Sequence, residues 1–246
     1  MAKQNRVLHI PEHRDQKTGV LVHGYNLNAS LWESVTWGSS KDQMGRIPMG
    51  IFVALSEKAE ALIFGSGASE REGIKESEAG ALMMRNRFDA LIDFPLFKKF
   101  FPKLKNSNSA LKYKNQIESI LHLDRISSNT IEELENAGRF FLKQNIDRIV
   151  VISSPTHLPR CIRDACRVFE ENKDLSYFRN QIYAVPSMTG FPGYAASDVT
   201  IFEPPHRPDR SPLNISSVVS RIHKIPDSAR GTFIQRLEKL LADFQV

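Results

Sequence analysis

Apolar residues in this chain occur both as short continuous runs and as stripes with helical spacing. The runs consist mainly of aliphatic residues, and polar or glycine-containing segments follow them, a pattern typical of buried parallel strands. We expect strands at residues 20–23, 61–64, 120–123, 149–152 and 181–185.

The stripes predict helices between these strands. The expected helices cover about residues 42–58 and 76–86, begin after the polar segments 127–130 and 153–156, and cover about 228–244 at the C-terminal end. Strands that alternate with helices predict a single α/β domain with a doubly wound, mostly parallel, Rossmann-like sheet and helices on both faces.

Two segments interrupt this pattern. Residues 186–215 are rich in proline and have no clear period, so we expect a long loop there. Residues from about 90 to 116 read as a basic-aromatic insertion, in which phenylalanines alternate with lysines over 94–114 without any acidic residue. The favoured interpretation is an amphipathic helix that packs its phenylalanines on the sheet and leaves its lysines in water. The alternatives are a lid over a site, or peripheral contact with an anionic membrane or polymer.

Polar turns follow the predicted strands. In open parallel sheets the ligand lies outside the carboxyl ends of the strands, so these turns are expected to form one crevice. The candidate ligand-binding residues in them are His23, Gly24, Asn26, Gly65, Ser66, Gly67, Asn129, Thr130, Ser153 and Ser154.

The segment after the fourth strand, Ser153 to Arg160, carries the sharpest chemical pattern. Thr156 is the expected N-cap of the next helix, and His157 and Arg160 are three residues apart, which places them on one face of its first turn. Exposed N–H groups and the positive end of the helix dipole favour an anion there. We expect Arg160 to bind a phosphate or carboxylate and His157 to act as a general acid or base.

Composition narrows the function without identifying it. The chain has 246 residues, of which 41% are hydrophobic and 25% charged, as in ordinary globular proteins. Its net charge of +5 is compatible with an anionic small molecule but too small to predict nucleic-acid binding. Cys161 and Cys166 lie on one predicted helix and are not expected to bridge. Because no signal peptide or membrane-spanning stretch is recognised, we expect a cytoplasmic protein.

The order of the motifs resembles that of the YdcF/ElyC/SanA-like family of bacterial proteins. The matching residues are Gly65-Ser-Gly67, Ser77-Glu-Ala79, Ser127-Ser-Asn-Thr130, Glu135-Asn-Ala137 and Ser153-Ser-Pro-Thr-His-Leu-Pro-Arg160. In the family, Glu-Asn-Ala follows the Thr element more closely, so Glu132 or Glu133 is the alternative for the acidic position. Without a membrane anchor the chain is more similar to the soluble YdcF type. The resemblance implies a Rossmann-like fold, a polar pocket and S-adenosylmethionine as a possible ligand, but no settled reaction.

Several candidates have a structural alternative. Glu78 can act as a base or bind a ribose hydroxyl, or simply favour the positive end of its helix. Asn129 and Thr130 can bind the ligand or cap a helix, and His23 and Asn26 can be ordinary turn residues. The segment from Val20 to Trp32 resembles the oxyanion strand of α/β-hydrolases, but no Gly-x-Ser-x-Gly elbow follows, which disfavours an esterase. The histidines are too scattered to predict a metal site.

The sequence therefore predicts an enzyme that binds a nucleotide-like or phosphorylated small molecule and cleaves or transfers a group from it. The alternative is a protein that binds a metabolite such as S-adenosylmethionine without catalysis.

Overall fold

The structure is a computed structural model that describes residues 16–189 and 225–243. The chain divides into two compact units, Met1–Ala195 and Ala196–Val246, and each is described separately.

The first unit is built on a five-stranded sheet in the order β5-β2-β1-β6-β7, in which all neighbours are parallel. This confirms the predicted α/β class and the parallel sheet. The strands are β1 (Thr18–Val22), β2 (Ala61–Phe64), β5 (Leu121–Leu123), β6 (Arg148–Ser153) and β7 (Ile182–Pro186). The sheet is extensively buried because β1, β2 and β6 consist of buried residues throughout.

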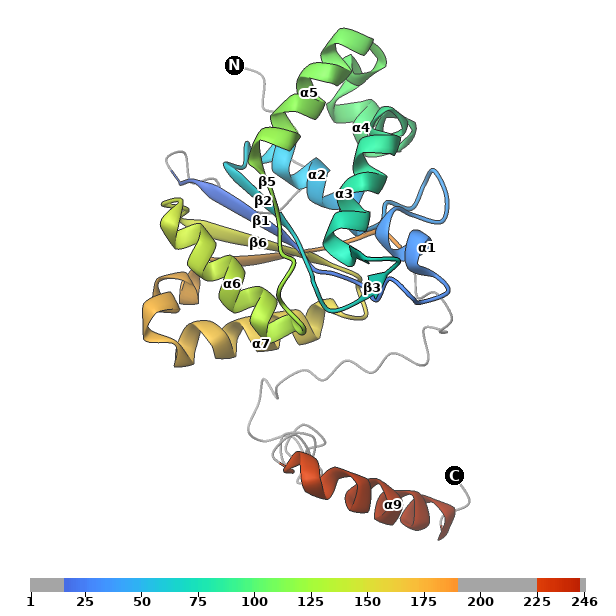
Figure 1. Ribbon diagram of the computed structural model, residues 1–246, viewed down its shortest axis with the longest axis vertical. Helices are drawn as coiled ribbons and strands as arrows, with labels where there is room; N and C mark the ends of the chain where they lie inside the picture. The colour runs from blue at the N-terminus through green and yellow to red at the C-terminus, as the bar shows by residue number, and fades with distance from the viewer. Residues whose placement is uncertain (1–15, 190–224, 244–246) are drawn as a thin grey trace, which may run out of the picture. The chain divides into compact units, whose positions relative to one another are not determined.

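Helices cover both faces of this sheet (Figure 1). Val20 and Val22 of β1 pack into one hydrophobic cluster, and Leu21, between them, packs into the other. The first cluster includes residues of α1 (Trp32–Thr36), α2 (Arg46–Ser56) and α3 (Glu76–Arg87). The second includes residues of α6 (Thr130–Lys143), α7 (Leu158–Glu171) and η3 (Lys173–Asn180). The alternation of side chains along each strand thus explains the doubly wound arrangement.

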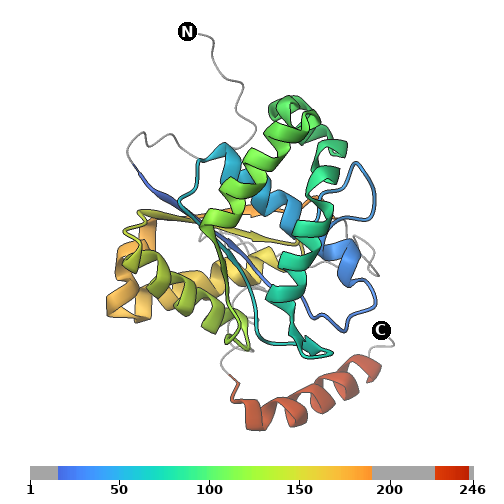
Figure 2. The ribbon, with the colours of Figure 1, turned by 45° about the horizontal axis from the view of Figure 1, so that its top comes forward.

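The basic-aromatic insertion is a helical hairpin on the first face, seen in green in Figures 1 and 2. It consists of η1 (Phe88–Asp93), α4 (Pro95–Phe100), η2 (Pro102–Lys105) and α5 (Ser107–Ile120). Phe97 is fully buried, and its ring centroid lies 5.5 Å from that of Phe52 on α2. The inward packing expected from the sequence is therefore confirmed for Phe97, but its ring contacts α2 rather than the sheet, and several short helices replace the single one.

A small antiparallel hairpin, β3 (Glu70–Arg71) and β4 (Ile74–Lys75), separates β2 from α3. Its turn contains Gly73 at a φ of +79°, a conformation that glycine adopts without steric cost. The polar segment that follows β2 thus passes through this hairpin before α3 begins.

The start of α7 differs from the sequence prediction. The N-cap is His157, without a side-chain capping bond, rather than Thr156. The N–H groups of His157 and Leu158 both donate to the Ser154 carbonyl, so a tight turn precedes the helix. The Thr156 prediction is wrong because this turn moves the N-cap one residue further along the chain.

In the second unit, α9 covers Asp227–Asp243, close to the predicted helix at 228–244. Most of the predicted proline-rich loop lies outside the described residues. None of the helices in the described part of the chain has the length and apolar character needed to span a bilayer.

Candidate functional site

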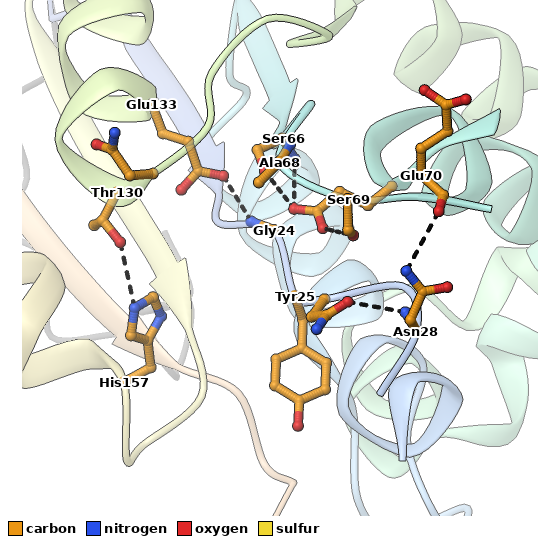
Figure 3. Close-up of a pocket in the computed structure, with 13 residues that line it drawn as sticks. Gly24, Tyr25, Asn28, Ser66, Ala68, Ser69, Glu70, Thr130, Glu133 and His157 are labelled. Atoms are coloured by element: carbon orange, nitrogen blue, oxygen red, sulfur yellow. Dashed lines mark hydrogen bonds between the residues drawn. The ribbon is translucent and has the colours of Figure 1, made fainter. Parts of the chain in front are cut away.

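A pocket of about 540 Å³ lies at the carboxyl ends of the strands, within the range of small-molecule sites (Figure 3). The segments that follow β1, β2, β5 and β6 all contribute to its lining. The sequence-predicted residues that line it are Gly24, Asn26, Ser66, Asn129, Thr130 and His157. These polar turns come together because all the strands point the same way.

Glu133, on the first turns of α6, connects the pocket to a buried histidine at the end of β1. Its Oε2 is hydrogen-bonded to Nδ1 of His23, and its Oε1 accepts the N–H of Gly24 at 3.0 Å. Both side chains are almost completely buried. Burial alone favours their neutral forms, but His23 and the Gly24 N–H hold the pKa of Glu133 below its ordinary value. Likewise, burial lowers the pKa of His23, but Glu133 and Cys161 outweigh it and raise this pKa to about 10.

Glu76, the first residue of α3, supplies a second carboxylate to the pocket. One oxygen accepts the N–H of Ser66 at 3.1 Å and the Ser66 hydroxyl, and the other accepts the Ser69 hydroxyl. These donors belong to the turn after β2, so the turn and the carboxylate fix each other. Ser66 is therefore placed in the site, but its hydroxyl is already engaged by a protein group.

Gly24 and Gly65 are needed because the two carboxylates approach the backbone closely. A Cβ at Gly24 would lie 2.0 Å from Glu76 Oε1, and one at Gly65 would lie 2.1 Å from Glu133 Oε1. Contacts that short do not occur, so any larger residue would displace a carboxylate. Gly24 lines the pocket, whereas Gly65 acts from beneath it.

Arg46, at the start of α2, lies buried behind the turn that follows β1. Its guanidinium donates from Nε to Ser154 Oγ at 2.9 Å and from Nη1 to the carbonyls of His23 and Gly24. Burial lowers its pKa, and Cys161 and Glu133 act in the opposite direction. Ser154 thus holds Arg46 and, like buried Ser153, is absent from the pocket lining.

His157 forms one wall of the pocket (Figure 3). Its Nδ1 is hydrogen-bonded to Ser153 Oγ at 2.9 Å, and its Nε2 lies 3.5 Å from Thr130 Oγ1. Two of the predicted ligand-binding residues, Ser153 and Thr130, therefore orient this imidazole. One nitrogen is held by the protein while the other faces a residue of the pocket.

Arg160 does not join His157. Its side chain is 57% exposed and lies 3.5 Å from Asp164 one turn further along α7, and it is absent from the pocket lining. The two residues separate because His157 precedes the helix and turns toward the strand ends. The structure therefore does not assemble the anion-binding pair expected from their spacing.

Glu78 also lies outside the pocket lining. It accepts the Lys75 N–H at 3.0 Å in a capping box and pairs with Arg125 at 2.8 Å. The Lys75 N–H and Arg125 both lower its pKa. This arrangement matches the structural alternative for Glu78, and Glu76 takes the place in the pocket.

The remaining predicted residues have local roles. Asn26 accepts the Asn28 N–H at 3.0 Å, and Asn129 caps α6 by accepting the Glu132 N–H at 3.0 Å. Gly67 donates its N–H to Ser127 at 3.0 Å and joins two of the turns without lining the pocket. His23 lies beneath the pocket rather than in its lining.

The lining is acidic. It contains three carboxylates, Glu70, Glu76 and Glu133, and no lysine or arginine among the residues that the structure describes. The sequence pattern did not predict that Glu76 lines the pocket, although this residue directly precedes the Ser77-Glu-Ala79 motif. Within residues 16–189 and 225–243, no cluster of three or more metal-ligating side chains is present.

Comparisons of the chain with family models, curated proteins and solved structures find no match.

Proposed function

We propose that the pocket binds a nucleotide-like small molecule, with Glu76 and Glu133 accepting hydrogen bonds from its hydroxyl groups. The observation that carries this proposal is the acidic lining at the carboxyl ends of four parallel strands. Carboxylates accept hydrogen bonds readily, and ribose hydroxyls donate them.

The same lining bears on the charge of the ligand. A polyphosphate would meet three carboxylates without any lining lysine or arginine among the described residues. A ligand with a positive group is favoured instead by simple electrostatics. S-adenosylmethionine, which combines ribose hydroxyls with a sulfonium and an amine, therefore fits the proposal better than a nucleoside triphosphate.

Calorimetric titration with S-adenosylmethionine, adenosine and ATP tests whether the affinity depends on the charge of the ligand in this way. We expect S-adenosylmethionine to bind most tightly and ATP most weakly. The Glu76→Gln variant should bind less tightly, because one acceptor and the negative charge are lost. Glu72→Gln is the matched control, since Glu72 is exposed and does not line the pocket. Tighter binding of ATP, or equal affinities in both variants, would contradict the proposal.

A second candidate function is group cleavage or transfer with His157 as the proton carrier. It is favoured by the hydrogen bond that fixes Nδ1 to Ser153 and leaves Nε2 at the pocket wall. Mass spectrometry of the ligand after incubation distinguishes the two functions. A product formed by the wild type and lost in His157→Gln supports catalysis, and a ligand recovered intact from both supports binding alone.

We also propose that the helical hairpin contacts an anionic lipid surface. Lys98, Lys99, Lys103, Lys105 and Lys112 are exposed and form no ion pair within the described chain. Exposed Leu111 lies among them on α5. Each lysine near an anionic membrane contributes about 1 kcal/mol, so several together can hold a protein there.

Co-sedimentation with phosphatidylcholine vesicles, with and without phosphatidylserine, tests this contact. Binding should require phosphatidylserine and should fall about tenfold or more when Lys99, Lys103 and Lys105 are all changed to glutamate. The matched control changes Lys58, Lys143 and Lys173 to glutamate, because these lysines are exposed and lie outside the hairpin. Equal binding by the two triple variants would refute a specific role for the hairpin.

A further inference from the structure

Cys161 lies behind the His157 wall of the pocket and has no part in the proposed ligand binding. It is buried in the first turns of α7. Its Sγ is 3.4 Å from Nδ1 and 3.9 Å from Nε2 of His157. His157 itself lines the pocket, so one imidazole ring touches both the thiol and the pocket space.

A second imidazole approaches the same region from β1. The rings of His23 and His157 meet edge to face, with centroids 5.9 Å apart. Nδ1 of His23 is held by Glu133, but its Nε2 is buried and has no hydrogen-bond partner among the described residues. Cys161 interacts electrostatically with His23, which makes the sulfur the natural acceptor for this unpartnered nitrogen.

These neighbours favour the thiolate. Burial raises the pKa of Cys161, but His23 and His157 outweigh burial and lower this pKa to about 6. Arg46 also interacts electrostatically with Cys161 and adds positive charge near the sulfur. Glu133 favours the protonated form of His23. The N-terminal end of α7 favours negative charge as well.

We propose that Cys161 is a reactive thiolate that hydrogen peroxide oxidises to a sulfenic acid. The sulfur attacks one peroxide oxygen, so that an S–O bond forms while the O–O bond breaks. The departing hydroxide takes a proton from the His23 imidazolium and leaves as water. The attacked oxygen keeps its hydrogen, so the product is the sulfenic acid, and the His23 imidazole regains its proton from solvent. The peroxide enters past His157, whose half-buried ring separates the pocket from the sulfur.

Oxidation would also affect the pocket. An oxygen added to Cys161 requires space beside His157. The imidazole ring must move to make this space, and the same ring forms a wall of the pocket. This regulatory consequence rests on the proposed ligand binding, whereas the oxidation itself does not.

The chain contains its own control for this chemistry. Cys166 lies five residues further along α7, is exposed, and is free like Cys161. Accessibility alone therefore predicts that Cys166 reacts first, whereas thiolate character predicts that Cys161 does.

The experiment uses the full chain in two single-cysteine forms, Cys166→Ser and Cys161→Ser. Each is treated with hydrogen peroxide and dimedone over a range of pH, and the labelled peptide is quantified by mass spectrometry. We expect faster labelling of Cys161 near neutral pH, with a rate that rises through a midpoint at about pH 6. Cys166 should be labelled more slowly there, although it is exposed.

Two outcomes would overturn the proposal. One is oxidation of Cys161 that occurs only when peroxide is added after unfolding in guanidinium, which would mean that burial excludes the oxidant. The other is labelling of Cys161 near neutral pH that is no faster than the labelling of Cys166. The effect of oxidation on the pocket is measured separately, by calorimetric titration of the oxidised Cys166→Ser form with S-adenosylmethionine. If oxidation leaves this affinity unchanged, the proposed regulation is refuted, whereas the proposed oxidation is not affected.

Discussion

His23 and Cys161 hold opposite charges inside the protein, and their effects on stability oppose each other. The pKa of His23 is raised from 6.5 to about 10, so its stabilisation is fully present below pH 6.5 and is lost as pH rises toward 10. The pKa of Cys161 is lowered from 9.0 to about 6, so its contribution is absent below pH 6 and develops as pH rises toward 9. Between about pH 6.5 and 9 the two contributions offset each other.

This offset gives a prediction for Cys161→Ala. Without the thiol, the stability that Cys161 gains with rising pH is absent, while the part of the His23 pKa shift caused by Glu133 remains, so the melting temperature should fall with rising pH across 6.5–9. The wild type should change less over the same range. Cys166→Ala is the control and should follow the wild type, because Cys166 is exposed whereas Cys161 is buried. Parallel pH profiles for all three proteins would show that His23 and Cys161 are not coupled in this way.

Asn129 illustrates how capping and ligand binding can be separated at a single position. Its side chain caps α6 through the Glu132 N–H, and it also lines the pocket. Asn129→Ala should reduce the free energy of unfolding by about 1 kcal/mol through loss of the cap. Asn129→Ser keeps a capping oxygen and should retain most of that stability while it loses the longer amide.

Denaturant unfolding and calorimetric titration of both Asn129 variants make the distinction. If Asn129 contacts the ligand, both variants should bind it more weakly, although only the alanine variant is strongly destabilised. Full affinity in Asn129→Ser would assign capping alone to this residue.

At the scale of elements, the hairpin depends on its aromatic contacts rather than on its lysines. Phe97 is fully buried, and its ring lies within 6 Å of the Phe52 and Phe101 ring centroids. Phe97→Ala should lower the free energy of unfolding by about 3–5 kcal/mol, since a large core cavity results. Lys98→Ala, at the adjacent exposed position, should change it by less than about 0.5 kcal/mol. Denaturant titration of the two variants provides the measurement, and similar values would place Phe97 outside the stabilising core.

The elements themselves were largely predictable because each strand is a short apolar run and each run ends in a polar turn. The segment Ala61–Phe64 is the clearest case, since its predicted and observed limits coincide. The parallel sheet, in turn, made it predictable that residues such as Asn129 and His157 would meet at one edge.

Side-chain directions near helix starts were not predictable in the same way. The prediction that His157 and Arg160 share one face required both residues to lie in the first turn of the helix. The tight turn at Ser154 instead places His157 before the helix. Similarly, Glu76 and Glu78 are two residues apart, and only the packing of α3 decides that Glu76 meets the Ser66 turn. For α6, the sequence did not distinguish Glu132 from Glu133, and only a tertiary contact, with His23, brings Glu133 to the pocket. These distinctions depend on tertiary contacts that no local pattern records.

At the scale of the whole molecule, the pocket joins segments that are far apart in the chain. Gly24, Ser66, Asn129 and His157 follow β1, β2, β5 and β6, respectively, so a ligand in contact with all four bridges most of the sheet. Unfolding of the first unit must destroy such a site completely. Ligand binding is therefore expected to stabilise that unit against unfolding and not merely to order one loop.

A ligand that binds only the folded state adds RT ln(1 + [L]/Kd) to the free energy of unfolding, or about 2.7 kcal/mol at a hundredfold excess over Kd. Scanning calorimetry with increasing S-adenosylmethionine should thus show a melting transition that moves upward with the logarithm of ligand concentration. Glu76→Gln should require more ligand for the same shift, whereas Glu72→Gln should behave like the wild type. If calorimetric titration detects binding but the transition stays in place, the ligand is bound outside the four-segment pocket, and the assignment of this pocket as the binding site is wrong.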